Sequence, residues 1–135
     1  MQYLTVPAQT EQLSAVQDFL EDLLIQNDCP PKTQLQVGLV AEEVFVNIAH
    51  YAYPDTPGDA MVGAQIDGDP PVLTLRFSDR GVPFDPLAHP ETDTTLPADK
   101  RPMGGLGILL TRRLVDKAEY SYQNGQNILT LQKKL

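Results

Sequence analysis

Three short segments of this 135-residue chain combine residue types that can do chemistry. The first carries Glu42, Glu43 and Asn47 within an otherwise apolar stretch. Glu43 and Asn47 are four residues apart, so they share one face of a predicted helix, whereas Glu42 is turned away by roughly 100°. A carboxylate beside a carboxamide oxygen suits a general base next to a ligand for Mg²⁺. The alternative interpretation is a solvated stripe on an amphipathic helix.

The second segment, DRGVPFD, follows an alternating run whose apolar face carries Leu73, Leu75 and Phe77. Asp79 continues the phase of these residues, so we predict that its carboxylate points toward the covered face of a sheet. A buried carboxylate needs a donor, and the amino group of a ligand is one candidate. Gly81 would let a ligand approach the backbone closely. The alternative is an Asx-type turn, in which Asp79 accepts backbone N–H groups.

The third segment is a glycine cluster that precedes a predicted amphipathic helix. Gly104, Gly105 and Gly107 would expose backbone N–H groups at the positive end of that helix, which is an arrangement that binds anions. No Gly-Lys-Ser/Thr follows, so the segment is not a P-loop, and it does not directly follow a strand as a dinucleotide fingerprint would. A flexible loop leading into a helix remains the alternative.

Composition limits the partners that such a site can have. The net charge is −8, which disfavours nucleic acid and anionic membranes and favours a basic partner protein. An anionic ligand would therefore need local positive potential. Cys29 is the single cysteine, so the chain forms no internal disulfide, and neither His50 nor His89 has metal-ligand spacing. Without a signal-peptide pattern or a long apolar run, we expect a cytoplasmic protein.

Periodicity and turn signals predict the elements that must position these segments. Strands are expected at 2–6, 61–66, 72–78, 118–123 and 127–134, and helices from a Thr10 cap through residue 24, over about 32–51, and from 105–107 through 117. Asn124-Gly125 predicts a hairpin, and the proline-marked stretch 85–103 predicts a long loop. The order β-α-α-β-β-loop-α-β-β favours an α+β two-layer sandwich, with a mixed or antiparallel sheet covered on one face by helices.

Taken together, the segments resemble a known family. EEVFVNIAHYAY resembles the N box of the GHKL ATPases, DRGVPFDP their first glycine box and GGLGILLTRRLVD their second, and NGQNILTLQKKL also fits. The resemblance runs from about Thr5 onward and is closest to the small anti-sigma-factor serine/threonine kinases of bacterial partner switching. It implies a Bergerat fold, with residues 1–135 forming one histidine-kinase-like ATPase domain and residues 85–103 its ATP lid. Pro83 departs from the wider superfamily, which often has a second glycine there.

The resemblance also implies roles for individual residues. Asn47 would coordinate the Mg²⁺ that bridges the phosphates, and Glu43 would be the general base. Asp79 would accept a hydrogen bond from the adenine amino group, while Gly81 would make room for the ring. The phosphates of ATP would be held by the loop that contains Gly104, Gly105, Leu106 and Gly107, with further positive charge from Lys100 and Arg101.

The function implied is that of an ATP-dependent protein kinase. Such a protein phosphorylates a serine or threonine of an anti-anti-sigma (STAS-type) partner and, in its other state, holds a sigma factor inactive. The same resemblance allows a homodimer. Two alternatives stay open at this point: a non-catalytic regulatory module that binds nucleotide as a switch, and a plain interaction domain without a nucleotide site.

Overall fold

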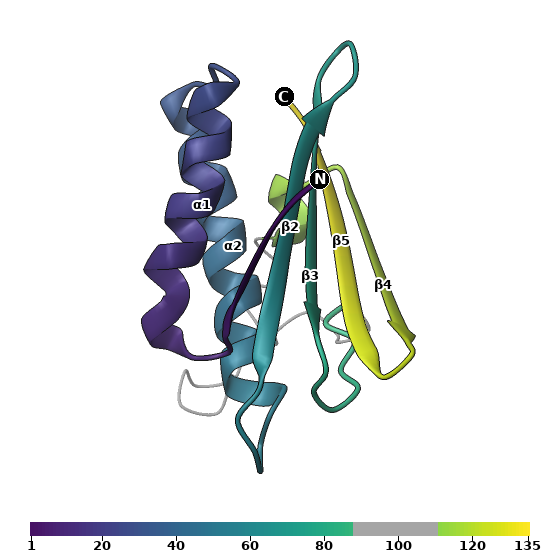
Figure 1. Ribbon diagram of the computed structural model, residues 1–135. Helices are drawn as coiled ribbons and strands as arrows, with labels where there is room; N and C mark the ends of the chain where they lie inside the picture. The colour runs from purple at the N-terminus through teal and green to yellow at the C-terminus, as the bar shows by residue number, and fades with distance from the viewer. Residues whose placement is uncertain (88–110) are drawn as a thin grey trace, which may run out of the picture.

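The computed structural model describes residues 1–87 and 111–135. Its helices and strands follow one another in the order β1 (Gln2–Pro7), the 3₁₀ helix η1 (Thr10–Gln12), α1 (Leu13–Gln26), α2 (Pro31–Tyr51), β2 (Asp59–Asp67), β3 (Val72–Asp79), β4 (Lys117–Gln123) and β5 (Gln126–Lys134). Residues 111–114 form a further helical stretch before β4. The two long helices lie side by side on one face of the sheet (Figure 1), so the predicted α+β sandwich is confirmed.

The sheet has five strands in the order β1-β2-β3-β5-β4, and every pairing in the described part of the chain is antiparallel. β3 is central, and the crossover that brings β5 beside it places Asp79 directly opposite Asn127. Two polar residues that are far apart in the sequence thus become neighbours at one end of the sheet.

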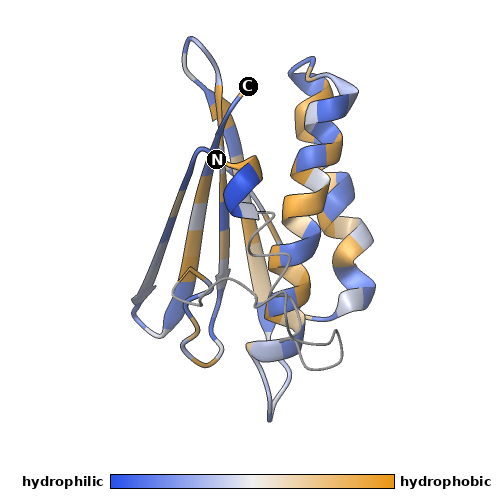
Figure 2. Cartoon of the chain, turned by 180° about the vertical axis from the view of Figure 1, so that it is seen from behind, coloured by the Kyte–Doolittle hydropathy of each residue, from blue (hydrophilic) through white to orange (hydrophobic). Residues whose placement is uncertain are grey.

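The core lies between the helices and the covered face of the sheet. The apolar stripe of α1 buries Val16, Leu20 and Leu24, and β3 contributes Leu73, Leu75 and Phe77 from alternating positions. Figure 2 shows these apolar stretches along the helices and the central strands. On α2 the residues Val37, Val40, Ala41, Val44 and Phe45 are buried, and the polar Asn47 is buried with them.

Two local features explain where an element begins and where the chain turns. α2 begins at Pro31, one residue before the predicted start, because a missing N–H costs nothing in the first turn of a helix. Asn124 and Gly125 have φ angles of 54° and 74°, which is the left-handed pair that a tight type I′ hairpin requires between β4 and β5.

Two local expectations are wrong. Thr10 does not cap α1, because it begins the 3₁₀ turn η1, whose N-cap is Gln9 without a side-chain hydrogen bond. The third predicted helix does not continue through Lys117: helical geometry ends at residue 114, and Lys117 is already the first residue of β4. In both places a neighbouring element takes over residues that the local pattern alone assigned to a helix.

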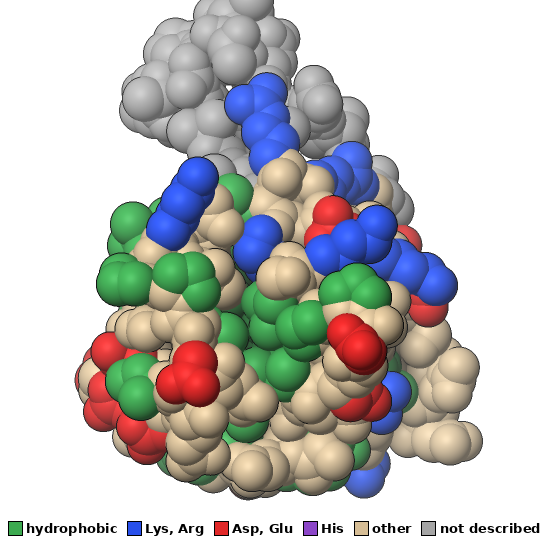
Figure 3. Space-filling model, turned by 90° about the horizontal axis from the view of Figure 1, so that it is seen from above, with side chains coloured by type: hydrophobic (Ala, Val, Ile, Leu, Met, Phe, Trp, Pro, Cys, Tyr) green, Lys and Arg blue, Asp and Glu red, His purple; other side chains and the backbone are tan. Residues whose placement is uncertain are grey.

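The charge of −8 is unevenly distributed over the surface. In the end-on view of Figure 3, Lys and Arg side chains gather in the upper half, whereas several Asp and Glu side chains lie at the lower left. The acidic average therefore does not describe every face of the molecule. Within 1–87 and 111–135, no helix combines the length and the apolar character needed to span a bilayer.

Candidate functional site

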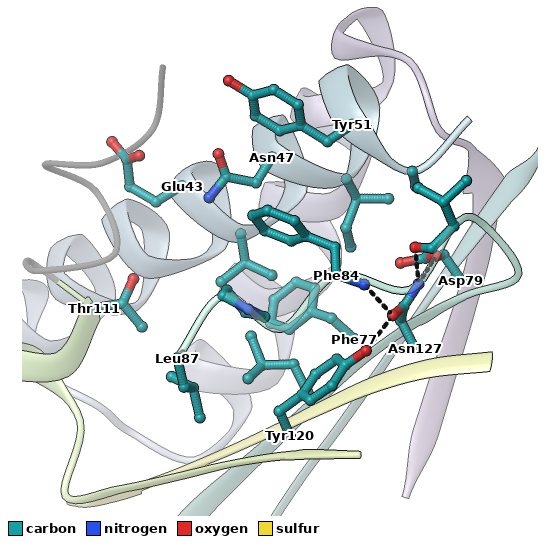
Figure 4. A pocket seen from close by; sticks show the side chains of 16 residues that line it. Glu43, Asn47, Tyr51, Phe77, Asp79, Phe84, Leu87, Thr111, Tyr120 and Asn127 are labelled. Atoms are coloured by element: carbon teal, nitrogen blue, oxygen red, sulfur yellow. Dashed lines mark hydrogen bonds between the residues drawn. The ribbon is translucent and has the colours of Figure 1, made fainter. Parts of the chain in front are cut away.

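A pocket lies between α2, the end of β3 and the paired strands β4 and β5 (Figure 4). It holds about 650 Å³ of empty space, part of which is open to solvent. Its walls are mostly apolar and are lined by Glu43, Val44, Asn47, Ile48, Tyr51, Ala52, Phe77, Asp79, Val82, Phe84, Pro86, Leu87, Thr111, Tyr120, Asn127 and Leu129. A few polar groups within apolar walls are typical of a small-molecule site.

One wall of the pocket is the face of α2 that carries Glu43, Asn47 and Tyr51 at intervals of one turn. Glu42 is exposed and does not line the pocket, so the helical phase separates the two adjacent carboxylates. The Asn47 side chain is only 8% exposed, and no described residue forms a hydrogen bond with its carboxamide. A buried amide that faces a pocket without a protein partner is poised to bind something else.

Glu43 is half-buried at the pocket wall. Burial raises the pKa of its carboxyl group, and the negative charge of Glu42 raises it further. Both effects make this carboxylate a better proton acceptor than an exposed one, as a general base requires.

Asp79 is buried at the end of β3, as its phase predicts, and one of its oxygens is fully engaged. Oδ1 accepts the backbone N–H of Gly81 at 2.9 Å and the side-chain N–H of Asn127 at 2.9 Å. The Gly81 contact is the Asx turn of the alternative interpretation. Oδ2 receives no hydrogen bond from the described residues, so the turn leaves an acceptor available. Burial raises the pKa of Asp79, and the hydrogen bonds from Asn127 and Gly81 oppose that rise.

Asn127 holds this corner of the pocket together. Its amide donates to Asp79 Oδ1 at 2.9 Å and to the carbonyl of Val82 at 2.9 Å. Its Oδ1 accepts the backbone N–H of Phe84 at 3.0 Å and the hydroxyl of Tyr120 at 2.5 Å. All four hydrogen-bonding positions of the amide are therefore used within the protein, and Asn127 positions Asp79 rather than binding a ligand itself.

The segment after β3, residues 80–87, also contacts the C-terminal end of α2. The N–H of Val82 donates to the carbonyl of Ala52 at 2.9 Å, and the ring of Phe84 stacks on Tyr51 with centroids 5.8 Å apart. Gly81 is required for this approach, because a Cβ at that position would lie 2.1 Å from the carbonyl oxygen of Ala52. The structure thus gives Gly81 a packing role against α2, and Gly81 itself does not line the pocket.

The remaining wall comes from the first residues of the predicted lid and from residues that follow it. Asp85 Oδ1 accepts the N–H of Leu87 at 2.8 Å, and the guanidinium of Arg112 donates to the carbonyl of Leu87. Thr111, at the start of the described helical stretch, contributes its side chain to the pocket.

The structure therefore brings Glu43, Asn47 and Asp79 to one pocket. The rest of the predicted phosphate site, namely Lys100, Arg101, Gly104, Gly105, Leu106 and Gly107, lies outside the described residues, as do positions 88–103 of the predicted lid. Sequence reasoning missed Asn127, Tyr120 and Thr111. Only Asn127 had a visible signal, since it is a polar residue in phase with the buried Leu129 and Leu131 of β5.

Comparison with known proteins identifies the family to which this chain belongs. The family model of the histidine kinase-like ATPase domain matches residues 6–133. No curated protein sequence matches the chain. Among solved structures, the histidine kinase AdeS of Acinetobacter baumannii is similar at 15% identity with a TM-score of 0.49, over 99% of this chain and 68% of that one. Because the family model spans almost the whole chain, this protein belongs to the family of histidine kinase-like ATPase domains, the GHKL-type ATPases.

Proposed function

We propose that this domain binds Mg-ATP in the pocket and transfers the terminal phosphoryl group to a serine or threonine of a partner protein. The observation that carries the proposal is the arrangement of the polar groups along one apolar pocket. Asp79 offers a single available carboxylate oxygen at one end, while Glu43 and Asn47 project from α2 toward the rest of it (Figure 4).

The Asp79 end suits the adenine base. Phe77 and Leu129 provide apolar surface for a flat ring, and Oδ2 of Asp79 would accept a hydrogen bond from its amino group. Since Oδ1 is occupied by Gly81 and Asn127, the direction of the free acceptor is set before the ligand arrives.

The residues present also fit a magnesium ion. Asn47 provides a buried amide oxygen without a described partner, and no group of three or more His, Cys, Asp or Glu side chains that could hold a metal occurs in the described ranges. Mg²⁺ in ATP sites is typically held by one or two protein oxygens together with the phosphates, so Asn47 would be its protein ligand here. Bound there, the ion would neutralise charge on the phosphates.

Glu43 would act on the attacking hydroxyl. Its carboxylate would take the proton of the serine or threonine as the hydroxyl oxygen bonds to the γ-phosphorus. The bond from that phosphorus to the bridging oxygen would break, and ADP would leave. The raised pKa of Glu43 suits this role because it brings the base nearer to neutral pH.

For the acceptor, we propose an anti-anti-sigma protein of the STAS type in the cytoplasm, with a sigma factor as the partner held in the other state. The support is the resemblance of the three motifs to the anti-sigma-factor kinases. A homodimer belongs to the same proposal.

The test is label transfer from γ-labelled ATP to candidate STAS-type proteins. Glu43→Gln should lower the transfer rate at least 100-fold, since general-base catalysis contributes roughly that much or more, while Mg-ATP affinity stays within about threefold. Glu42→Gln is the matched control, because it removes the adjacent carboxylate that does not line the pocket, and it should retain most of the activity.

Three other results have distinct meanings. Equal transfer by wild type and Glu43→Gln would refute the role of Glu43. Tight Mg-ATP binding without transfer to any partner would favour the non-catalytic switch module. Absence of nucleotide binding would refute the proposal as a whole.

A further inference from the structure

The amide of Asn127 can adopt only one of its two orientations. Its oxygen accepts the backbone N–H of Phe84 at 3.0 Å and the hydroxyl of Tyr120, while its nitrogen donates to the carbonyl of Val82 at 2.9 Å (Figure 4). Turning the amide by 180° would set its oxygen against the Val82 carbonyl and its N–H groups against the N–H of Phe84. The nitrogen of Asn127 therefore always faces Asp79.

This fixed orientation determines what Asp79 offers to a ligand. Oδ1 of Asp79 is held by two donors, the N–H of Gly81 and the N–H of Asn127. These donors favour the ionised carboxylate, which opposes the rise of its pKa on burial. Oδ2 is not one of the inaccessible unpartnered atoms of the described residues, and Asp79 lines the pocket. Asp79 thus presents a single atom there, and that atom is a hydrogen-bond acceptor.

An acceptor in a fixed position distinguishes two classes of purine. A 6-amino purine places an N–H donor at its 6-position, which satisfies the carboxylate oxygen. A 6-oxo purine places a carbonyl oxygen there, so two acceptors would face each other and both would lose their hydration without a partner. A site with a fixed polar group rejects such an analogue more strongly than an apolar site does.

We infer that Asn127 determines the base specificity of this site: by holding Oδ1 of Asp79, it keeps Oδ2 as a fixed acceptor that selects 6-amino over 6-oxo purine nucleotides. The inference rests on the proposed function, because it takes the purine end of the nucleotide to lie at Asp79. Asn127 is a positioning residue, since it acts on the base through Asp79. Without Asn127, the carboxylate would keep one donor and could turn about its Cβ–Cγ bond.

The experiment measures the affinities for Mg-ATP and for the magnesium complex of inosine triphosphate, its 6-oxo analogue, by calorimetric titration. Wild type should prefer ATP at least about tenfold, because a hydrogen bond to a charged group is replaced by two opposed acceptors. Asn127→Ala should lower this preference to about threefold or less by weakening ATP binding more than inosine triphosphate binding. Thr130→Ala, on the same strand, should leave both affinities within about twofold of wild type.

A second variant tests the same arrangement without removing Asn127. In Asp79→Asn, the side-chain oxygen should stay on the N–H groups of Gly81 and Asn127, so the new N–H faces the base. The preference should then invert, and inosine triphosphate should bind more tightly than ATP. If Asn127 and Gly81 did not hold residue 79, its amide could turn to suit either base, and the preference would disappear instead of inverting.

Each contrary result has a distinct meaning. Equal affinity of wild type for the two nucleotides would overturn the inference and leave the proposed function intact. An Asn127→Ala variant that binds both nucleotides more weakly by the same factor would also overturn it, because Asn127 would then only stabilise the fold. If Asn127→Ala does not fold, a preference that disappears in Asp79→Asn overturns the inference and an inverted one supports it. If wild type binds neither nucleotide, the proposed function fails, and the inference fails with it.

Discussion

Replacing Asn127 with alanine should destabilise the ligand-free domain far more than a polar-to-alanine change at the surface. The side chain is 7% exposed and makes hydrogen bonds to Asp79, Val82, Phe84 and Tyr120. These partners belong to β3, to the segment after β3 and to β4. A single substitution in β5 therefore disconnects three parts of the pocket at once.

The magnitude follows from the four bonds. A hydrogen bond within a protein contributes a net 0.5–1.5 kcal/mol, so four contribute roughly 2–6 kcal/mol. Because the pocket is partly open, water can solvate some of the groups that are left behind, which lowers the expected loss to about 3 kcal/mol. The cost is concentrated in Asp79, which keeps its buried charge but loses one of the two donors to its Oδ1.

The assay is urea unfolding at pH 7, followed by circular dichroism. Thr130→Ala is the matched control on the same strand, since Thr130 is half-buried on the opposite face and should lose less than about 1 kcal/mol. Asn127→Asp offers a second check. It keeps the oxygen that accepts from Phe84 and Tyr120 but faces Asp79 with a second carboxylate, so its stability should fall as the pH rises. A loss below about 1 kcal/mol for Asn127→Ala would refute the view that this network holds the pocket.

Two further predictions concern Asp79 and the glycines. Asp79→Asn should lower Mg-ATP affinity at least tenfold in calorimetry, because an amide N–H would replace the acceptor oxygen that faces the ligand. Since the pKa of Asp79 is raised in the folded protein, its contribution to stability is present below its ordinary value of 3.8 and is lost as the pH rises through the raised one. Urea unfolding at pH 7 should therefore find ligand-free Asp79→Asn at least as stable as wild type, and a clear loss would contradict this sign. Gly81→Ala should cost about 2 kcal/mol or more, because its Cβ would meet the backbone of Ala52. Gly38→Ala in α2, where nothing lies within 4 Å, should instead gain roughly 0.5–1 kcal/mol, and thermal melts of both variants would show opposite shifts.

Local periodicity was sufficient for much of the fold and for one wall of the site. The spacing of Glu43 and Asn47 placed both on one face of a helix, and the structure finds both in one pocket while Glu42 is exposed. The alternation that ends at Asp79 predicted its burial, which is confirmed. These properties depend on residues within a few positions of each other, so a period of 3.6 or 2 is enough to predict them.

Two predicted helix boundaries are wrong, because in each case the residues belong to a neighbouring element. The residues around Thr10 form a 3₁₀ turn, and Lys117 joins β4 instead of continuing a helix. Lys117 is part of a strand because it pairs with Gln132 of β5, which follows it in the chain. A local pattern contains no information about such a partner.

The sequence by itself determined the helical and strand phases, the hairpin at Asn124-Gly125 and the burial of a carboxylate at the end of β3. Tertiary structure alone decided what that carboxylate does. Asn127 reaches Asp79 across 48 positions because β5 pairs with β3 in a particular register, and a shift of one residue would turn the amide to the opposite face. The pocket likewise forms only because α2, β3, β4 and β5, which are far apart in the sequence, pack together. Hydrogen bonds and cavities form between surfaces that the fold brings together, and their partners cannot be read from spacing along one element.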